Sequence, residues 1–153
     1  MRILWPNFKK SDDPKIKKWT GLITVVVQDI RTKEVLMVAF ANEEALRKTL
    51  ATGKATFFTR SRGRLWTKGE ESGNFMKVLD VRPDCDGDAL LLLVEPLGEG
   101  LACHTESYSC FFRRITGEEL MHPGKALGPD ETLPMVEVEV NPSIYLLAAM
   151  PQK

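Results

Sequence analysis

Alternating and continuous apolar runs divide the chain into short strands and one helix. Segments rich in Val, Ile, Leu and Phe, bounded by turn-forming residues, are typical of β-strands. The longest continuous run, at 89–95, is typical of a buried strand. Segments of these kinds predict strands at 22–28, 35–40, 55–59, 65–67, 75–81 and 89–95.

One segment has the pattern of an amphipathic helix, at about 43–52. Asn42 can cap its N-terminus, and the acidic residues that follow suit the positive end of the helix dipole. Gly53 can adopt the left-handed conformation after the last turn. Leu46 and Leu50 lie one turn apart and are expected to face the core.

The C-terminal part of the chain has a different character. The Gly- and Pro-containing segment 116–132 predicts a long loop, and the alternation of Val136, Val138 and Val140 with glutamates predicts a strand with one exposed face. The apolar segment 144–149 is expected to dock on the body of the protein. The pattern predicts a single α+β domain over 1–153, β-dominated, with mostly antiparallel strands, one main helix and a C-terminal extension at 115–153.

The composition argues against a nucleic-acid-binding protein and against a membrane protein. Hydrophobic residues make up 43% of the chain, and 21 basic residues balance 21 acidic ones. Zero net charge gives no general attraction to nucleic acid or to anionic membranes. No segment is long and apolar enough to span a membrane, and the N-terminal region lacks the apolar stretch of a secretory signal. We therefore expect a cytoplasmic protein.

The three cysteines are Cys85, Cys103 and Cys110, with the spacing C-x17-C-x6-C. A structural zinc ion normally has four protein ligands, whereas a catalytic zinc ion keeps one position open for water. Three thiolates fit the open arrangement. On spacing alone, three buried, inert thiols are the favoured alternative.

An acidic cluster surrounds the first cysteine: Asp84, Asp86 and Asp88 lie at alternate positions in DCDGD. Carboxylates of this kind suit a hard cation such as magnesium. A solvated acidic turn is the alternative. If the backbone is extended here, the Cys85 side chain points away from Asp84 and Asp86.

A basic segment, RSRGRLWTKGEESG, carries Arg60, Arg62, Arg64 and Lys68. Guanidinium groups match phosphate oxygens in a bidentate manner, and glycines let backbone amides approach an anion. The alternatives are a solvated basic hairpin and a nucleic-acid-binding patch in which Trp66 stacks on bases.

His104 directly follows Cys103. It can be a fourth metal ligand, a general base or an ordinary loop histidine.

Together, these segments are similar to those of the phosphoribosyl-AMP cyclohydrolase family. The resemblance covers about residues 21–113 and rests on runs that occur in the same order: VQD at 27–29, NEEALRKTL at 42–50, TRSRGRLWTKGEESGN at 59–74, DCDGD at 84–88 and ACHTESYSCFFR at 102–113. The order of these runs is more specific than any of them alone.

The resemblance implies a cytoplasmic hydrolase of histidine biosynthesis, in which a zinc-activated water opens the adenine ring of 1-(5-phosphoribosyl)-AMP between N1 and C6. It implies a homodimer that shares its zinc ligands between subunits and also uses magnesium. It makes Cys85, Cys103 and Cys110 the zinc ligands and Asp84, Asp86 and Asp88 the magnesium ligands. A zinc-stabilised nucleic-acid-binding module that uses the basic 60–68 segment is the alternative function.

Within this family reading, we expect His104 to accept or relay a proton. Arg60, Arg62 and Lys68 are the candidates for phosphate contact, with Glu70 and Ser72 near the site. The chain departs from the family pattern at Met76, where glutamine is expected, and at Glu106, where glycine is common.

Overall fold

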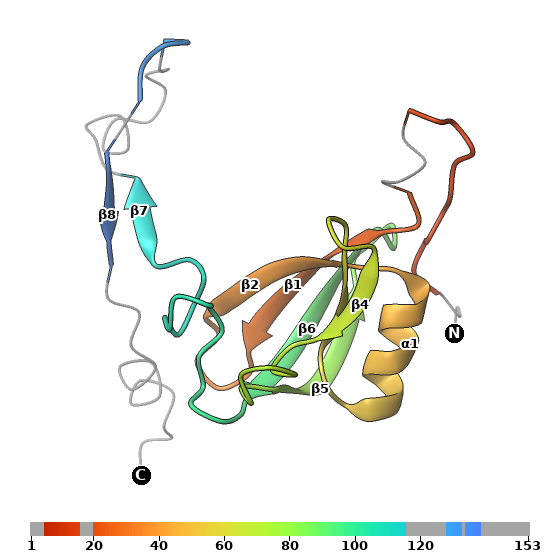
Figure 1. Cartoon of the computed structure of the whole chain (residues 1–153), viewed down its shortest axis with the longest axis horizontal. Coiled ribbons are helices and arrows are strands. Elements are labelled where there is room, and N and C mark those ends of the chain that lie inside the picture. The colour runs from red at the N-terminus through yellow and green to blue at the C-terminus, as the bar shows by residue number, and fades with distance from the viewer. Residues whose placement is uncertain (1–4, 16–19, 116–127, 133, 139–153) are drawn as a thin grey trace.

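The computed structural model of the chain describes residues 5–15, 20–115, 128–132 and 134–138. These ranges contain eight strands and one helix (Figure 1). The elements are β1 (Ile23–Asp29), β2 (Val35–Ala41), α1 (Glu43–Thr52), β3 (Thr56–Thr59), β4 (Arg64–Thr67), β5 (Met76–Pro83), β6 (Ala89–Pro96), β7 (Arg113–Ile115) and β8 (Met135–Glu137).

The predicted β-dominated α+β fold is confirmed, and strand ends agree with the sequence pattern within about two residues. The pattern at 136–140 corresponds to β8 as far as residue 137, whereas β7 was not predicted. The expected docking of 144–149 and most of the predicted loop at 116–132 lie outside the described residues.

Four strands form one sheet in the order β2-β1-β6-β5. Both outer pairs, β1 with β2 and β5 with β6, are antiparallel, whereas the central pair β1 and β6 is parallel. The register pairs Thr24 with Ala89 at one end of the sheet and Asp29 with Val94 at the other. The acidic turn lies at the Ala89 end, and the loop with Cys103 and Cys110 lies at the Val94 end.

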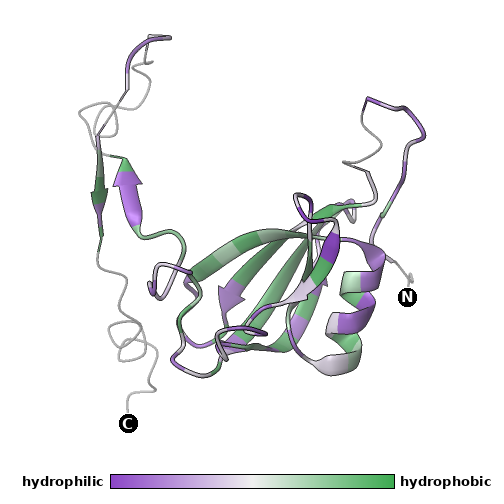
Figure 2. Cartoon of the chain, in the orientation of Figure 1, coloured by the Kyte–Doolittle hydropathy of each residue, from purple (hydrophilic) through white to green (hydrophobic). Residues whose placement is uncertain are grey.

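The core lies on one face of this sheet. Val25 and Val27 of β1 and Leu92 of β6 pack in a single cluster with Leu46 of α1 and Phe57 of β3. The helix and the β3–β4 hairpin therefore cover this face, and Figure 2 shows the strands beneath them as mostly apolar.

The ends of α1 follow the sequence prediction. The side chain of Asn42 accepts a hydrogen bond from the backbone of Ala45 at 2.8 Å, and Gly53 ends the helix with φ 73°. The prediction for Leu50 was wrong, because its side chain is 54% exposed. The helix presents Ala45, Leu46 and Thr49 to the core, so Leu50 falls on its outer flank. In the described part of the chain, no helix is both long and apolar enough to cross a membrane.

Candidate active site

A cavity of about 670 Å³ lies between the β3–β4 hairpin, the loop 68–74 and the segment 99–106. Most of the sequence-predicted site residues outside the acidic cluster line it. They are Arg62, Lys68, Glu70, Ser72, Cys103 and His104. The cavity therefore brings basic groups, one thiol and one histidine together around a single space, while the roles of these residues stay predictions.

The sequence analysis missed several other lining residues: Thr67, Asn74, Glu99 and Leu101, together with Arg64 and Trp66 as cavity residues. Their positions in polar loops and on the hairpin gave no indication of which way each side chain points. Only the spatial approach of segment 99–106 to the hairpin identifies them.

The hairpin that carries the basic residues is held from both sides. The rings of Phe57 and Trp66 meet edge to face, with their centroids 5.3 Å apart. Phe57 belongs to the buried core, so this contact anchors the hairpin to it. Glu70 accepts a hydrogen bond from the backbone of Thr67 and forms an ion pair with Arg64 at 3.3 Å. Glu70 therefore orients the hairpin and one guanidinium at the cavity.

The loop that follows depends on a glycine. Gly69 has φ 95°, a conformation that side chains rarely adopt, and a Cβ atom there would collide with the backbone of Asn74 and Phe75. Gly69 thus lets the loop 68–74 fold back tightly beside the cavity.

Two of the three thiols lie together, because Cys103 lines the cavity and Cys110 lies within hydrogen-bonding reach of Cys103. Thr105 donates a hydrogen bond to the sulfur of Cys103 at 3.0 Å. Burial acts to raise the pKa of Cys103, but hydrogen bonds from Thr105 and Cys110 and the charge of Lys68 lower it overall. Burial, together with the negative charge on Cys103, raises the pKa of Cys110 to about 11. Cys103 therefore loses its proton more readily than Cys110.

Lys68 provides the positive charge next to this pair. Burial lowers the pKa of Lys68, while the two thiols act in the opposite direction. Two sulfur ligands with a stabilised thiolate suit a soft cation such as zinc, which binds deprotonated cysteine. The donor set at Cys103 and Cys110 therefore fits zinc, although it supplies two ligands and not three.

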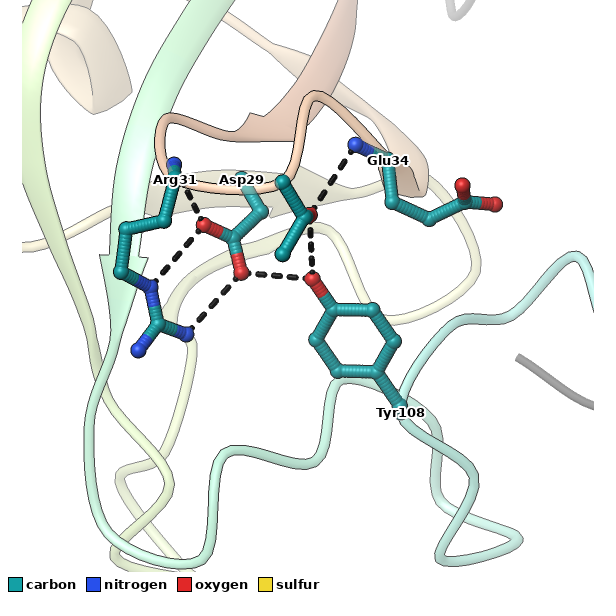
Figure 3. Close-up of polar contacts among 5 residues, drawn as sticks. Asp29, Arg31, Glu34 and Tyr108 are labelled. Carbon is teal, nitrogen blue, oxygen red and sulfur yellow. Dashed lines mark hydrogen bonds and ion pairs between the residues drawn. The ribbon is translucent and has the colours of Figure 1, made fainter. Parts of the chain in front are cut away.

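The loop that carries these thiols is tied to the turn between β1 and β2 (Figure 3). The Tyr108 hydroxyl donates to Asp29 at 2.6 Å, and Arg31 contacts the same carboxylate through two nitrogens. Thr32 shares a 2.7 Å hydrogen bond with the Tyr108 hydroxyl. Although burial acts to raise the pKa of Asp29, its hydrogen bonds from Arg31 and Tyr108 lower it overall, so the buried group stays a carboxylate.

Two further contacts anchor the end of this loop to β2. The backbone N–H of Cys110 donates to the carbonyl of Leu36 at 2.8 Å, and the hydroxyl of Ser109 donates to the carbonyl of Val35 at 2.7 Å. Cys110 is thus held at the end of the sheet where β1 ends and β2 begins.

The acidic cluster forms a turn between β5 and β6. Its three carboxylates offer oxygen atoms within 4.8 Å of one another, and Asp84 accepts hydrogen bonds from the backbone of Asp88 and Ala89. The backbone bends here, so the extended arrangement considered for Cys85 does not apply. Hydrogen bonds with Asp86 and Asp84 raise the pKa of Asp88 to about 6. Three clustered oxygen donors suit magnesium.

Cys85 lies in this acidic turn and is exposed. The turn directly precedes Ala89, whereas the Cys103–Cys110 loop is tied to the end of the sheet near Val94. The strand rises about 17 Å between these two positions, at about 3.3 Å per residue. Sulfurs bound to one zinc ion lie only about 4 Å apart. A single chain therefore brings two of the predicted zinc ligands together and leaves the third at the opposite end of the sheet.

The structure also places three other residues that the sequence analysis singled out. The guanidinium of Arg60 stacks over the Phe40 ring at 4.1 Å and lines a neighbouring hollow instead of the main cavity. Met76 is 1% exposed and belongs to the core. Glu106 lines the main cavity with φ 68°, so it holds a conformation that favours glycine.

Comparisons with known proteins identify the family of this chain. The family model described as phosphoribosyl-AMP cyclohydrolase matches residues 37–112. A phosphoribosyl-AMP cyclohydrolase of Archaeoglobus fulgidus is 59% identical over 100 residues, which cover 65% of this chain and 91% of that protein. One of Rhizorhabdus wittichii is 61% identical over 95 residues, covering 62% of this chain and 75% of that protein.

A histidine biosynthesis bifunctional protein of Aquifex aeolicus is also similar, with 50% identity over 117 residues that cover 76% of this chain and 55% of that protein. The matched region contains the β3–β4 hairpin, the acidic turn and the thiol loop. The chain therefore belongs to the phosphoribosyl-AMP cyclohydrolase family of hydrolases.

Proposed function

We propose that the chain opens the adenine ring of 1-(5-phosphoribosyl)-AMP by hydrolysis, as a step of histidine biosynthesis in the cytoplasm. Water adds to C6, the N1–C6 bond breaks, and N1 takes up a proton. The observation that carries the proposal is the cavity itself, because it places Arg62 and Lys68 around the same space as Cys103 and His104.

The basic residues supply the binding of an anionic substrate. Phosphoribosyl-AMP carries two separate phosphate groups, and guanidinium forks bind phosphate oxygens in pairs. Arg62 and Arg64 line the cavity on the β3–β4 hairpin, and Lys68 lies half-buried beside the thiols. We assign Arg62 and Lys68 to phosphate contact. Arg60 would contact a phosphate group only if its guanidinium moved away from the Phe40 ring.

The thiolates of Cys103 and Cys110 would hold a zinc ion, with Cys85 of a second copy as the third ligand. A zinc ion bound in this way supplies Lewis acidity, which lowers the pKa of a coordinated water from ~16 toward ~7. Thr105 supports Cys103 as a thiolate through its hydroxyl. The Asp29–Tyr108 contact fixes the loop that carries both ligands.

His104 would handle the proton. It lines the cavity next to Cys103 in sequence, so its ring can accept or relay the proton that water releases during the attack on C6. A positioned general base contributes roughly 10²–10⁴-fold to a rate.

The aspartates of the acidic turn would hold magnesium. Their oxygens already lie within 4.8 Å of one another. If Cys85 of one copy joins the thiols of another, the same turn brings Asp84, Asp86 and Asp88 to that copy's cavity. Magnesium would then neutralise phosphate charge beside the zinc ion, which is a common use of this cation.

The direct test is an absorbance assay with phosphoribosyl-AMP before and after treatment with a chelator. We expect turnover that disappears on chelation and returns when zinc is added back. Cys103→Ser should lose zinc and turnover together, whereas Thr52→Ala, which removes an exposed hydroxyl of α1, should keep both. Turnover by a preparation without bound zinc would contradict the zinc assignment, and absence of turnover in the zinc-loaded protein would contradict the reaction.

A further inference from the structure

The N-terminal arm, which we define as residues 5–10, crosses the acidic turn between β5 and β6. The backbone N–H of Asn7 donates a hydrogen bond to the carbonyl of Gly87 at 2.7 Å. Gly87 has φ 76°, and a Cβ atom on it would lie 3.5 Å from the nitrogen of Asn7 and 3.7 Å from the Cα atom of Pro6. The backbone of the arm therefore lies directly against the glycine of the acidic turn.

The arm is itself held by the body of the chain. Pro6 is buried, and Phe8 packs against the core cluster. The carbonyl of Lys9 accepts a hydrogen bond from the backbone N–H of Gly21 at 2.8 Å, shortly before β1 begins. The arm is therefore fixed on both sides of the residue that contacts the turn. It also precedes residues 37–112, which the family model matches.

Trp5 connects the outer end of the arm to α1. The guanidinium of Arg47 lies over its ring, 5.0 Å from the ring centroid, and Glu43 forms an ion pair with the same guanidinium at 2.9 Å. A cation over the face of a tryptophan ring is attracted to it even at exposed positions. Trp5 is two residues from Asn7, so a very short stretch of chain joins the helix to the acidic turn.

The acidic turn benefits from such a contact because its charges oppose its folded shape. Its three carboxylates offer oxygen atoms within 4.8 Å of one another, and like charges at this separation repel. Inside the turn, the N–H of Gly87 donates to the carbonyl of Asp84 at 3.2 Å, which is long for a hydrogen bond. The shorter bond from Asn7 holds the same glycine from outside. A turn that is already closed does not have to be ordered by the cation that binds it.

We infer that the arm is a clamp that holds the acidic turn in the shape that binds a divalent cation, with Trp5 and Asn7 as positioning residues. The inference rests on the proposed magnesium site. Because coupling between two binding events is reciprocal, docking of the arm strengthens magnesium binding by the same factor by which magnesium strengthens docking of the arm. A segment that only covers part of the core would leave both equilibria unchanged.

Asn7→Pro tests the clamp because it removes the N–H that reaches Gly87, and Asn7→Ala is the matched control because it keeps that N–H. Magnesium chloride is titrated into each full-length variant by calorimetry, and the melting temperature reports on the fold. Loss of one backbone hydrogen bond corresponds to about a fivefold change in an equilibrium constant. We expect the magnesium dissociation constant to rise about fivefold for Asn7→Pro and to keep the parent value for Asn7→Ala.

Amide hydrogen exchange of the parent chain, followed by mass spectrometry, measures the reciprocal effect. The peptide that contains Asn7 should exchange about fivefold more slowly in saturating magnesium chloride than without it, because exchange there requires the arm to open. A structural contact that is not coupled to the cation would give equal rates in the two conditions.

Arg47→Ala is a second variant, which weakens the hold on Trp5 and leaves the backbone of the arm unchanged. Lys54→Ala is its control, because it also removes one positive charge and one cation–ring contact, with Phe75 at 4.3 Å, beyond the opposite end of α1. We expect weaker magnesium binding for Arg47→Ala and parent affinity for Lys54→Ala.

The outcomes separate the clamp from the site it serves. Parent magnesium affinity in both Asn7→Pro and Arg47→Ala, even with a lowered melting temperature, would overturn the inference, and so would arm exchange that does not respond to magnesium. If Asn7→Pro does not fold, Arg47→Ala and the exchange of the parent chain decide. If the parent chain does not bind magnesium, or if Asp86→Asn binds it equally well, the proposed magnesium site fails first and the inference fails with it.

Discussion

The hydroxyl of Tyr108 donates a 2.6 Å hydrogen bond to the buried carboxylate of Asp29, across 79 residues of sequence. Tyr108 lies in the loop between Cys103 and Cys110, and Asp29 ends β1 (Figure 3). The contact joins the loop that bears two thiols to the sheet. Arg31 and Thr32 strengthen it, since Arg31 binds the same carboxylate and Thr32 binds the same hydroxyl. The position of the thiols therefore depends on a group that does not touch the cavity.

Tyr108→Phe should weaken this link without changing the shape of the ring. Loss of a hydrogen bond to a charged, buried group should lower the free energy of unfolding by about 2 kcal/mol. We also expect weaker zinc binding with a smaller change in KM, since the basic residues remain in place. Urea unfolding and zinc titration measure both effects, with Thr52→Ala as the exposed-hydroxyl control. Unchanged stability and zinc affinity would show that the loop is positioned by its backbone contacts alone.

His104→Ala should leave zinc bound and slow turnover by roughly 10²–10⁴-fold, the usual contribution of a general base. The chain has two histidines, and His122 provides the control, because no role is assigned to it. Metal analysis and turnover are measured on the same preparations. A normal rate for His104→Ala would make this residue a bystander, and lost zinc would make it a ligand.

Magnesium binding should depend on pH through Asp88. Hydrogen bonding with Asp86 and Asp84 raises the pKa of Asp88 to about 6, so the group is mostly protonated at pH 5 and mostly ionised at pH 7.5. Only the ionised form is a good cation ligand. Magnesium affinity should therefore increase as the pH rises through 6, and binding near that pH should release a proton.

Calorimetric titration at several pH values in two buffers of different ionisation enthalpy measures both the affinity and the released proton. Asp86→Asn should weaken magnesium binding and move this pH dependence to lower pH, because it removes one carboxylate charge and the hydrogen bond that contributes most to the raised pKa of Asp88. Identical titrations for the parent chain and Asp86→Asn would remove Asp86 from the set of ligands.

Glu106→Gly should stabilise the protein. Glu106 has φ 68°, and a residue with a Cβ atom in this conformation costs roughly 1 kcal/mol relative to glycine. We expect the free energy of unfolding to rise by about that amount. Lys33→Gly is the matched control, since Lys33 has φ 66° but does not line the cavity. If only Glu106→Gly changes KM, the Glu106 side chain contributes to the site; a loss of stability would contradict the strain argument.

Most elements of the fold follow from local sequence pattern. The cap at Asn42, the glycine at 53 and the apolar runs of the strands are short-range features, and the structure agrees with them. The error at Leu50 has a geometric origin. The sequence pattern of a helix does not decide between two adjacent rows of side chains as the core-facing row. Here α1 packs against β3, and this contact buries Thr49 while Leu50 stays exposed.

The site was less accessible to sequence reasoning. The residue types of the proposed site are recognisable in the sequence as local clusters. The sequence does not show how far apart these clusters lie in the folded chain. Nothing in the spacing of the cysteines indicates that Cys85 is separated from Cys103 by the length of β6, because this follows from the parallel pairing of β1 and β6. Asp29 and Tyr108 were missed as partners for the same reason, since pairing across 79 residues leaves no local pattern.

The central claim is that two chains supply the thiols of one zinc site. Subunit mixing tests it most directly. Cys85→Ser and Cys103→Ser are each expected to lack tight zinc and turnover. When equal amounts are unfolded and refolded together, random pairing gives mixed dimers in which one site has all its thiols, so about a quarter of the parent chain's zinc and activity should return. If the mixture stays as inactive as its components, the thiols of each site come from one chain and the account is wrong.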